Sequence, residues 1–233
     1  MAIHNKRAMS LGIILALSFL GVLVLIFSPI FGDGRSGLIF ADDMFNKLSK
    51  GSSYFIPNVL EDAKKFAGKQ ITTSVKLDKP EETAKVLKIL TVAGANVEAK
   101  DTEIKIVADL GNLMTKALQD SDDMYKNEGK LVSSRYGFDE KEVMTAWWNL
   151  MKPLDKQLKK EGMVADAKLV SDVMKKAVET AHNFYGIEAQ KVADNAFIMI
   201  GLLTFYVLYT MWWGFAIYYI FEGVGLSTSK AKH

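Results

Sequence analysis

Cysteine is absent from the chain, and histidine is scarce, with three residues. Without cysteine the protein can form no disulfide, thiolate nucleophile, iron–sulfur cluster, c-type haem attachment or lipoprotein anchor. Two of the histidines, His4 and His233, lie in the terminal tails, which leaves His182 without the clustered ligands that a zinc ion requires. We therefore expect no metal and no cofactor, and we interpret His182 as a helix-capping or surface residue.

The sequence also lacks the motifs of serine hydrolases, P-loop and dinucleotide-binding proteins, and zinc proteases. Asp120, Asp122 and Asp123 resemble a calcium-binding loop only superficially, because Lys126 and Asn127 stand where the loop should continue. We interpret these acids as the solvated end of a helix. No catalytic residue is predicted, and an enzyme that uses dispersed carboxylates stays as a third functional hypothesis.

Charged residues are missing from two long apolar stretches, 8–32 and 195–221. About 20 helical residues cross the hydrocarbon core of a bilayer, so each stretch predicts a transmembrane helix. The expected organisation is a tail at 1–7, a first span at 8–32, an α+β domain at 33–194, a second span at 195–222 and a tail at 223–233. Both tails then lie on one side of the membrane, and the domain lies on the other.

The short tails carry Lys6, Arg7, Lys230 and Lys232, and the positive-inside rule therefore places both termini in the cytoplasm. We predict a protein of the bacterial cytoplasmic (inner) membrane whose domain lies on the periplasmic or extracellular side. A cleaved secretory signal is the alternative for the first span, but its apolar run is longer than a signal core. An uncleaved signal anchor fits better. The near-neutral domain, with no basic stripe, predicts no nucleic-acid partner.

Within the domain, region 71–108 predicts a small β-α-β-β unit. Strands are expected at 71–77, 95–99 and 102–108, where β-branched residues are frequent, and a helix is expected at 83–93. Asp78 should cap this helix, with Glu81 completing a capping box. The helix would let the first two strands pair in parallel through a right-handed crossover. Lys100 and Asp101 would form the turn before the third strand.

The rest of the domain is predicted to be helical, because apolar residues repeat every three to four positions. The expected helices are 38–50, a segment after Pro57, 110–124, 139–160 and 165–185. Pro153 should kink or split the fourth of these. No strong helix breaker follows Ile187, so we expect one continuous helix from there to Phe221. The predicted fold class is α+β, with two transmembrane helices flanking one mostly helical extracytoplasmic domain.

The second span is unusually aromatic. Tyr206, Tyr209, Trp212 and Trp213 lie towards its middle, where a polar-tipped ring needs a hydrogen-bond partner that lipid does not supply. We therefore expect protein rather than lipid around these side chains.

Small residues four positions apart occur on both spans, Thr210 with Gly214 and Gly12 with Ala16. Such pairs let two helices approach closely. They fit contact with a partner subunit, and they also fit the simpler alternative that the two spans pack on one another.

Trp147 and Trp148 are adjacent, so on a helix they point about 100° apart and cannot both enter one core. We expect one of them to be buried and take Trp148 as the one that meets a second surface, which is a partner protein, a ligand or the rest of the domain.

Together these features favour a non-catalytic accessory or assembly subunit of a larger membrane protein complex. The expected protein-contact residues are Tyr206, Tyr209, Thr210, Trp212, Trp213, Gly214 and Trp148. Other membrane protein subunits and membrane lipid are the expected partners, and a homo-oligomer is compatible with the same residues. The alternative is an extracytoplasmic ligand-binding or sensory module that signals through a partner, since the tail after Glu222 is too short for a signalling domain.

Overall fold

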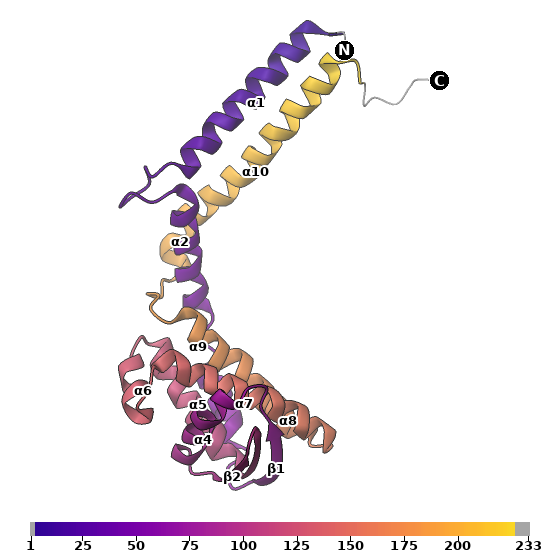
Figure 1. Cartoon of the computed structure of the whole chain (residues 1–233). Coiled ribbons are helices and arrows are strands. Elements are labelled where there is room, and N and C mark those ends of the chain that lie inside the picture. The colour runs from indigo at the N-terminus through magenta and orange to yellow at the C-terminus, as the bar shows by residue number, and fades with distance from the viewer. Residues whose placement is uncertain (1–2, 227–233) are drawn as a thin grey trace. The chain divides into compact units, whose positions relative to one another are not determined.

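A computed structural model of the chain describes residues 3–226. It divides into two compact units, one formed by the two ends of the chain and the other by Lys50–Ala189. The helices are α1 (Lys6–Phe27), α2 (Gly37–Ser52), α3 (Ile56–Lys64), α4 (Pro80–Val92), α5 (Leu110–Tyr125), α6 (Gly129–Tyr136), α7 (Glu140–Lys160), α8 (Val164–Val173), the π-helix η1 (Met174–Val178), α9 (Glu179–Phe184) and α10 (Val192–Gly223). The strands are β1 (Gln70–Lys76), β2 (Asn96–Lys100) and β3 (Glu103–Asp109) (Figure 1). The prediction of a mostly helical α+β chain is confirmed.

Two helices, α1 and α10, are long and apolar enough to cross a membrane, which weakly indicates a membrane protein. They lie side by side and antiparallel in the first unit (Figure 1). A Cβ atom on Gly12 would lie 2.7 Å from the backbone nitrogen of Ile220, and one on Gly223 would lie 2.7 Å from the Cβ atom of Met9. The two spans therefore pack on one another, and glycine makes their closest approaches.

The predicted continuous helix from Ile187 is wrong, because α10 begins at Val192. Lys191 is extended, with φ −78° and ψ 136°, and Gly186 has a φ of 86° that other residues rarely adopt. The carbonyl oxygen of Ile187 accepts hydrogen bonds from the side chains of Lys50 and Asn127. In a helix this carbonyl oxygen would accept a hydrogen bond from a backbone N–H. Because Lys50 and Asn127 supply its hydrogen bonds instead, the segment from Ile187 to Lys191 needs no helical partner and stays outside α10.

The three strands form one antiparallel sheet in the order β1-β3-β2. The predicted parallel pairing of the first two strands is therefore wrong, because β3 lies between them. The turn from β2 to β3 consists of Asp101 and Thr102, and Asp101 adopts a φ of 54° that aspartate tolerates better than most residues. Ile104, Ile106 and Ala108 of β3 are buried, whereas β2 is largely exposed, so burial favours β3 at the centre.

The start of α4 also differs from the prediction. Lys79 occupies the N-cap position and makes no side-chain capping bond, so the expected cap at Asp78 and its capping box with Glu81 are wrong. Pro80 takes the first helical position, because it has no N–H to satisfy and its φ suits a helix, and this moves the cap one residue past Asp78.

Three further differences concern the helices that pack around the sheet. The sequence did not predict α6, which ends at Gly137 in the left-handed conformation. Helix α7 runs through Pro153 as one element, so the predicted split does not occur. The helix expected at 165–185 is present as α8, η1 and α9, with the π-helix at Met174–Val178 between two α-helical parts.

Candidate functional site

The aromatic residues of α10 have different environments. The rings of Tyr209 and Trp213 lie 4.1 and 4.7 Å from the ring of Phe19 on α1. The Tyr209 hydroxyl donates a 3.0 Å hydrogen bond to the carbonyl oxygen of Phe19, which is the partner that a polar-tipped ring needs in an apolar setting. The buried Nε1 of Trp212 has no acceptor among residues 3–226.

The register of α1 against α10 places Tyr206 away from the middle of the hairpin. The contacts of Met9 with Gly223 and of Phe19 with Trp213 put the end of α1, at Phe27, beside the turn of α10 that contains Tyr206. Tyr206 is 65% exposed there. Thr210 and Gly214 are also exposed, and nothing lies within 4 Å of a Cβ atom built on Gly214. The pair Thr210 and Gly214 therefore takes no part in the contact with α1.

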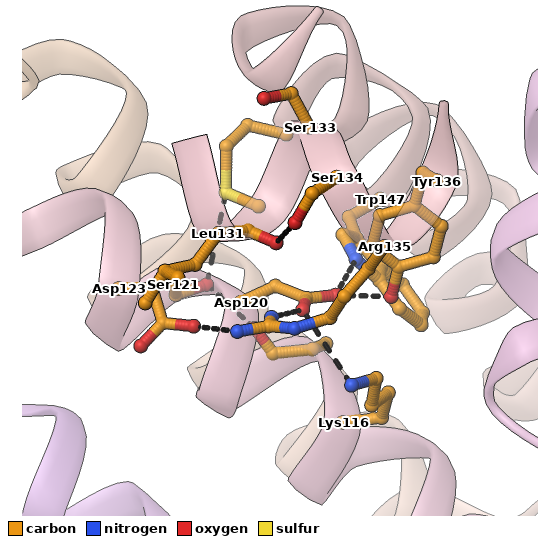
Figure 2. A network of polar contacts seen from close by, with 12 residues as sticks. Lys116, Asp120, Ser121, Asp123, Leu131, Ser133, Ser134, Arg135, Tyr136 and Trp147 are labelled. Atoms are coloured by element: carbon orange, nitrogen blue, oxygen red, sulfur yellow. Dashed lines mark hydrogen bonds and ion pairs between the residues drawn. The ribbon is translucent and has the colours of Figure 1, made fainter. Parts of the chain in front are cut away.

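In the Lys50–Ala189 unit, the carboxylate of Asp120 is fully buried and holds four groups around it (Figure 2). Arg135 and Tyr136 of α6 donate hydrogen bonds to it, and Trp147 Nε1 of α7 donates one of 3.0 Å. The ammonium of Lys116 lies 3.8 Å away. Burial and the charge of Asp120 raise the pKa of the Tyr136 phenol. This carboxylate therefore ties α5, α6 and α7 together.

The interpretation of all three acids as a solvated helix end is wrong for Asp120. Asp123 is partly buried and pairs with Arg135, whereas Asp122 pairs with the exposed Lys126 at 2.7 Å. Asp120 follows Ala117 by three positions and precedes Met124 by four, so it shares the buried face of α5 with them. That spacing could have indicated that Asp120 is buried. Its counterion Arg135, however, comes from α6, a helix that the sequence did not predict.

The Asp120 network positions Trp148, the predicted contact residue of the domain. Because Trp147 is buried and hydrogen-bonded to Asp120, the rotation of α7 about its axis is fixed. Trp148 then points about 100° away and is only partly buried, as the adjacent pair predicts. Two cavities border it, one on each side.

The first cavity is small and mostly apolar, with a volume of about 270 Å³. Its lining residues are Met144, Thr145, Trp148, Val178, Glu179, His182 and Asn183. The π-helix ends at Val178, on its wall, and such segments are frequent at functional sites. His182 lies in the last turn of α9, and its Nδ1 is 3.3 Å from the side-chain oxygen of Asn183.

The second cavity is a groove of about 400 Å³ between β1 and α7. Trp148, Lys152, Lys156 and Lys160 occur every fourth residue along its helical wall, and Lys76 lies at the strand. The sequence analysis missed this row because the domain has almost equal numbers of acids and bases. Net charge says little about how charges are placed on one face.

Comparisons with known protein families, curated proteins and solved structures find no match to this chain. The functional argument therefore depends on the geometry of the chain itself. Among residues 3–226, no group of three or more His, Asp and Glu side chains is arranged to hold a metal ion.

A second buried charge, Lys50, was not singled out by the sequence. Its ammonium donates hydrogen bonds to the carbonyl oxygens of Phe184 and Ile187 at 3.1 and 2.6 Å and to the side-chain oxygen of Asn127 at 3.0 Å. Burial lowers the pKa of Lys50, against the opposing attraction of Glu188. Lys50, the first residue of the Lys50–Ala189 unit, is thus bonded to Phe184 and Ile187, close to the last residue of that unit.

Proposed function

We propose that the chain is a non-catalytic accessory or assembly subunit of a larger complex in the bacterial cytoplasmic membrane. Its α+β domain lies on the periplasmic or extracellular side, and both termini are cytoplasmic. The two long apolar helices support membrane insertion, and the positive residues of the tails support this orientation. Membrane protein subunits contact it through α10.

The observation that carries this proposal is the open position of Thr210 and Gly214. The stripe of α10 that packs on α1 contains Tyr209, Trp213, Ala216, Ile220 and Gly223. Thr210 and Gly214 each follow a residue of that stripe, so they lie about 100° around the helix from it. The Thr210 hydroxyl bonds to its own helix, to the carbonyl oxygens of Tyr206 and Val207. This leaves a shallow surface on which a partner helix can pack closely.

The test replaces Gly214 with leucine in the full-length chain. Wild-type protein extracted from native membranes in mild detergent should migrate in native electrophoresis as a complex larger than the monomer. Gly214→Leu should reduce the fraction in that complex about fivefold or more, since 1 kcal/mol of lost packing changes an equilibrium by that factor. Gly201→Leu is the matched control, because a Cβ atom at Gly201 also has nothing within 4 Å and Gly201 is also on α10.

Migration of the wild type as a monomer, with no co-purifying subunit, would contradict the proposal. Equal loss with both leucine variants would show that the small pair is not the contact. Mass spectrometry of the complex separates a second copy of this chain from a different subunit.

A second candidate function is the ligand-binding or sensory module, and the apolar cavity beside Trp148 favours it. The cavity combines an aromatic wall with the polar groups of Glu179, His182 and Asn183 at its edge. In a thermal-shift screen with small metabolites, a ligand of this cavity should raise the unfolding temperature saturably. Trp148→Ala should abolish that shift, whereas a shift that survives the substitution would exclude this cavity as the binding site.

A further inference from the structure

Strand β1 has a free edge. Lys69 accepts a hydrogen bond from Leu110, and Leu77 donates one to Thr102, both at 2.9 Å. Antiparallel ladders alternate, so with this register the odd-numbered residues between them bond to β3. The backbone groups of Thr72, Ser74 and Lys76 point away from β3, and no other part of chain 3–226 supplies them with a partner. An unpaired row of this kind is a template for one more strand.

The lysine groove lies beside this edge. Ser74, Val75, Lys76 and Leu77 form one wall, and the row of Trp148, Lys152, Lys156 and Lys160 lies on the other. None of the four groove lysines forms an ion pair within the described part of the chain, while Asp78 and Glu82 supply two negative charges to the same lining. The groove therefore presents excess positive charge next to unpaired backbone donors and acceptors.

We propose that this groove binds an extended, acidic segment of a partner protein, which adds as a strand to the free edge of β1. The carboxylates of the segment face Lys76, Lys152 and Lys156, and an apolar side chain packs on Trp148. The row from Trp148 to Lys160 is about 18 Å long at 1.5 Å per residue. This length accommodates about five residues of extended chain.

The groove lysines and the unpaired edge of β1 together favour an acidic peptide segment over other anionic partners. An anionic lipid or a nucleic acid would satisfy the lysines, but neither offers alternating N–H and C=O groups to the edge of β1. Lysine on an edge strand also prevents association between sheets, which would explain Lys76 but not the three lysines on α7. The groove belongs entirely to the Lys50–Ala189 unit, so the inference does not depend on the proposed contact of α10.

The test measures fluorescence anisotropy of a labelled peptide with the full-length protein in lipid nanodiscs. The probe has about seven residues: among the alternate positions that share one face, an end position is phenylalanine, for Trp148, and the others are glutamate, for the lysines. The positions between them are valine. It should bind saturably with a Kd below about 1 mM. The double variant Lys152→Glu, Lys156→Glu should weaken binding about tenfold, since reversal of each exposed charge contributes a factor of about two to five. The control Lys168→Glu, Lys175→Glu makes the same charge change at exposed lysines of α8 and η1 and should leave the Kd within about twofold.

A second arm tests the backbone contacts. The same peptide with N-methyl groups on alternate amides keeps its charges but cannot pair with β1, and it should lose binding about tenfold or more. Equal binding of the methylated peptide, or equal binding by the two double variants, would overturn the proposal. It would also be overturned if single-stranded DNA or anionic vesicles bound through the groove lysines while the peptide did not bind. Unchanged urea unfolding of each variant ensures that a loss of binding is not a loss of fold.

Discussion

Asp120→Ala is expected to lower the free energy of unfolding of the Lys50–Ala189 unit by about 3–5 kcal/mol. The carboxylate has no exposed surface and accepts hydrogen bonds from Arg135, Tyr136 and Trp147. Removing it leaves the Trp147 N–H and the Tyr136 hydroxyl buried without their acceptor, and it leaves Arg135 with Asp123 alone. Breaking a buried ion pair at one partner is costly because the other charge stays in a poorly solvated site.

Urea unfolding followed by near-ultraviolet circular dichroism measures this loss. The control is Asp122→Ala, because Asp122 belongs to the same acidic run but pairs with the exposed Lys126 and Tyr54. It should cost less than about 1 kcal/mol. If the two alanine variants were equally stable, Asp120 would not be the residue that joins the three helices, and the orientation of Trp148 would need another explanation.

Lys50→Met is expected to destabilise the same unit by about 2–3 kcal/mol. Methionine has a similar length, but it leaves the carbonyl oxygens of Phe184 and Ile187 and the side chain of Asn127 without the ammonium. Amide hydrogen exchange should become faster from Tyr185 to Ala189, because the segment loses its bonds to Lys50. Lys126→Met is the control, since Lys126 is exposed and pairs only at the surface, and it should cost less than about 1 kcal/mol.

The effect of pH gives this prediction an independent readout. Burial lowers the pKa of Lys50, so the unfolded chain binds this proton more tightly than the folded chain does. Stability contributed through this group therefore rises as the pH approaches 10.5, the ordinary value for lysine. The stability difference between wild type and Lys50→Met should be larger at about pH 10 than at about pH 8. A difference that shrinks over this range would show that the ammonium is not held in a buried site.

Residue patterns within one element were predictable, whereas partnerships between elements were not. The alternation of Ile104, Ile106 and Ala108 identifies β3 as a strand with one buried face, and the adjacent Trp147 and Trp148 predict one buried ring. The strand order depends instead on which strand best fills the centre of the sheet. The residue pattern of one strand does not show how well that strand would fill the centre compared with the other two.

Two of the buried charges, Asp120 and Lys50, show the same limit. Asp120 and Lys50 are ordinary surface residue types, and each is stabilised by groups that lie far away in the sequence. Arg135 reaches Asp120 from α6, and the carbonyl oxygens that bind Lys50 come from the far end of the unit. Composition and spacing could indicate that a residue shares an apolar face, but they could not identify the distant counterion or acceptor.

The bond between Lys50 and Ile187 also determines how the domain would respond to mechanical tension. A pull applied at the two ends of the unit would load the three hydrogen bonds of the Lys50 ammonium first, with the Tyr125 hydroxyl bonded to the Lys50 carbonyl beside them. While those bonds hold, they carry part of the force that would otherwise reach the sheet and the remaining helices. The Lys50 side chain thus connects the two ends of the domain and takes up part of the strain that its own chain transmits.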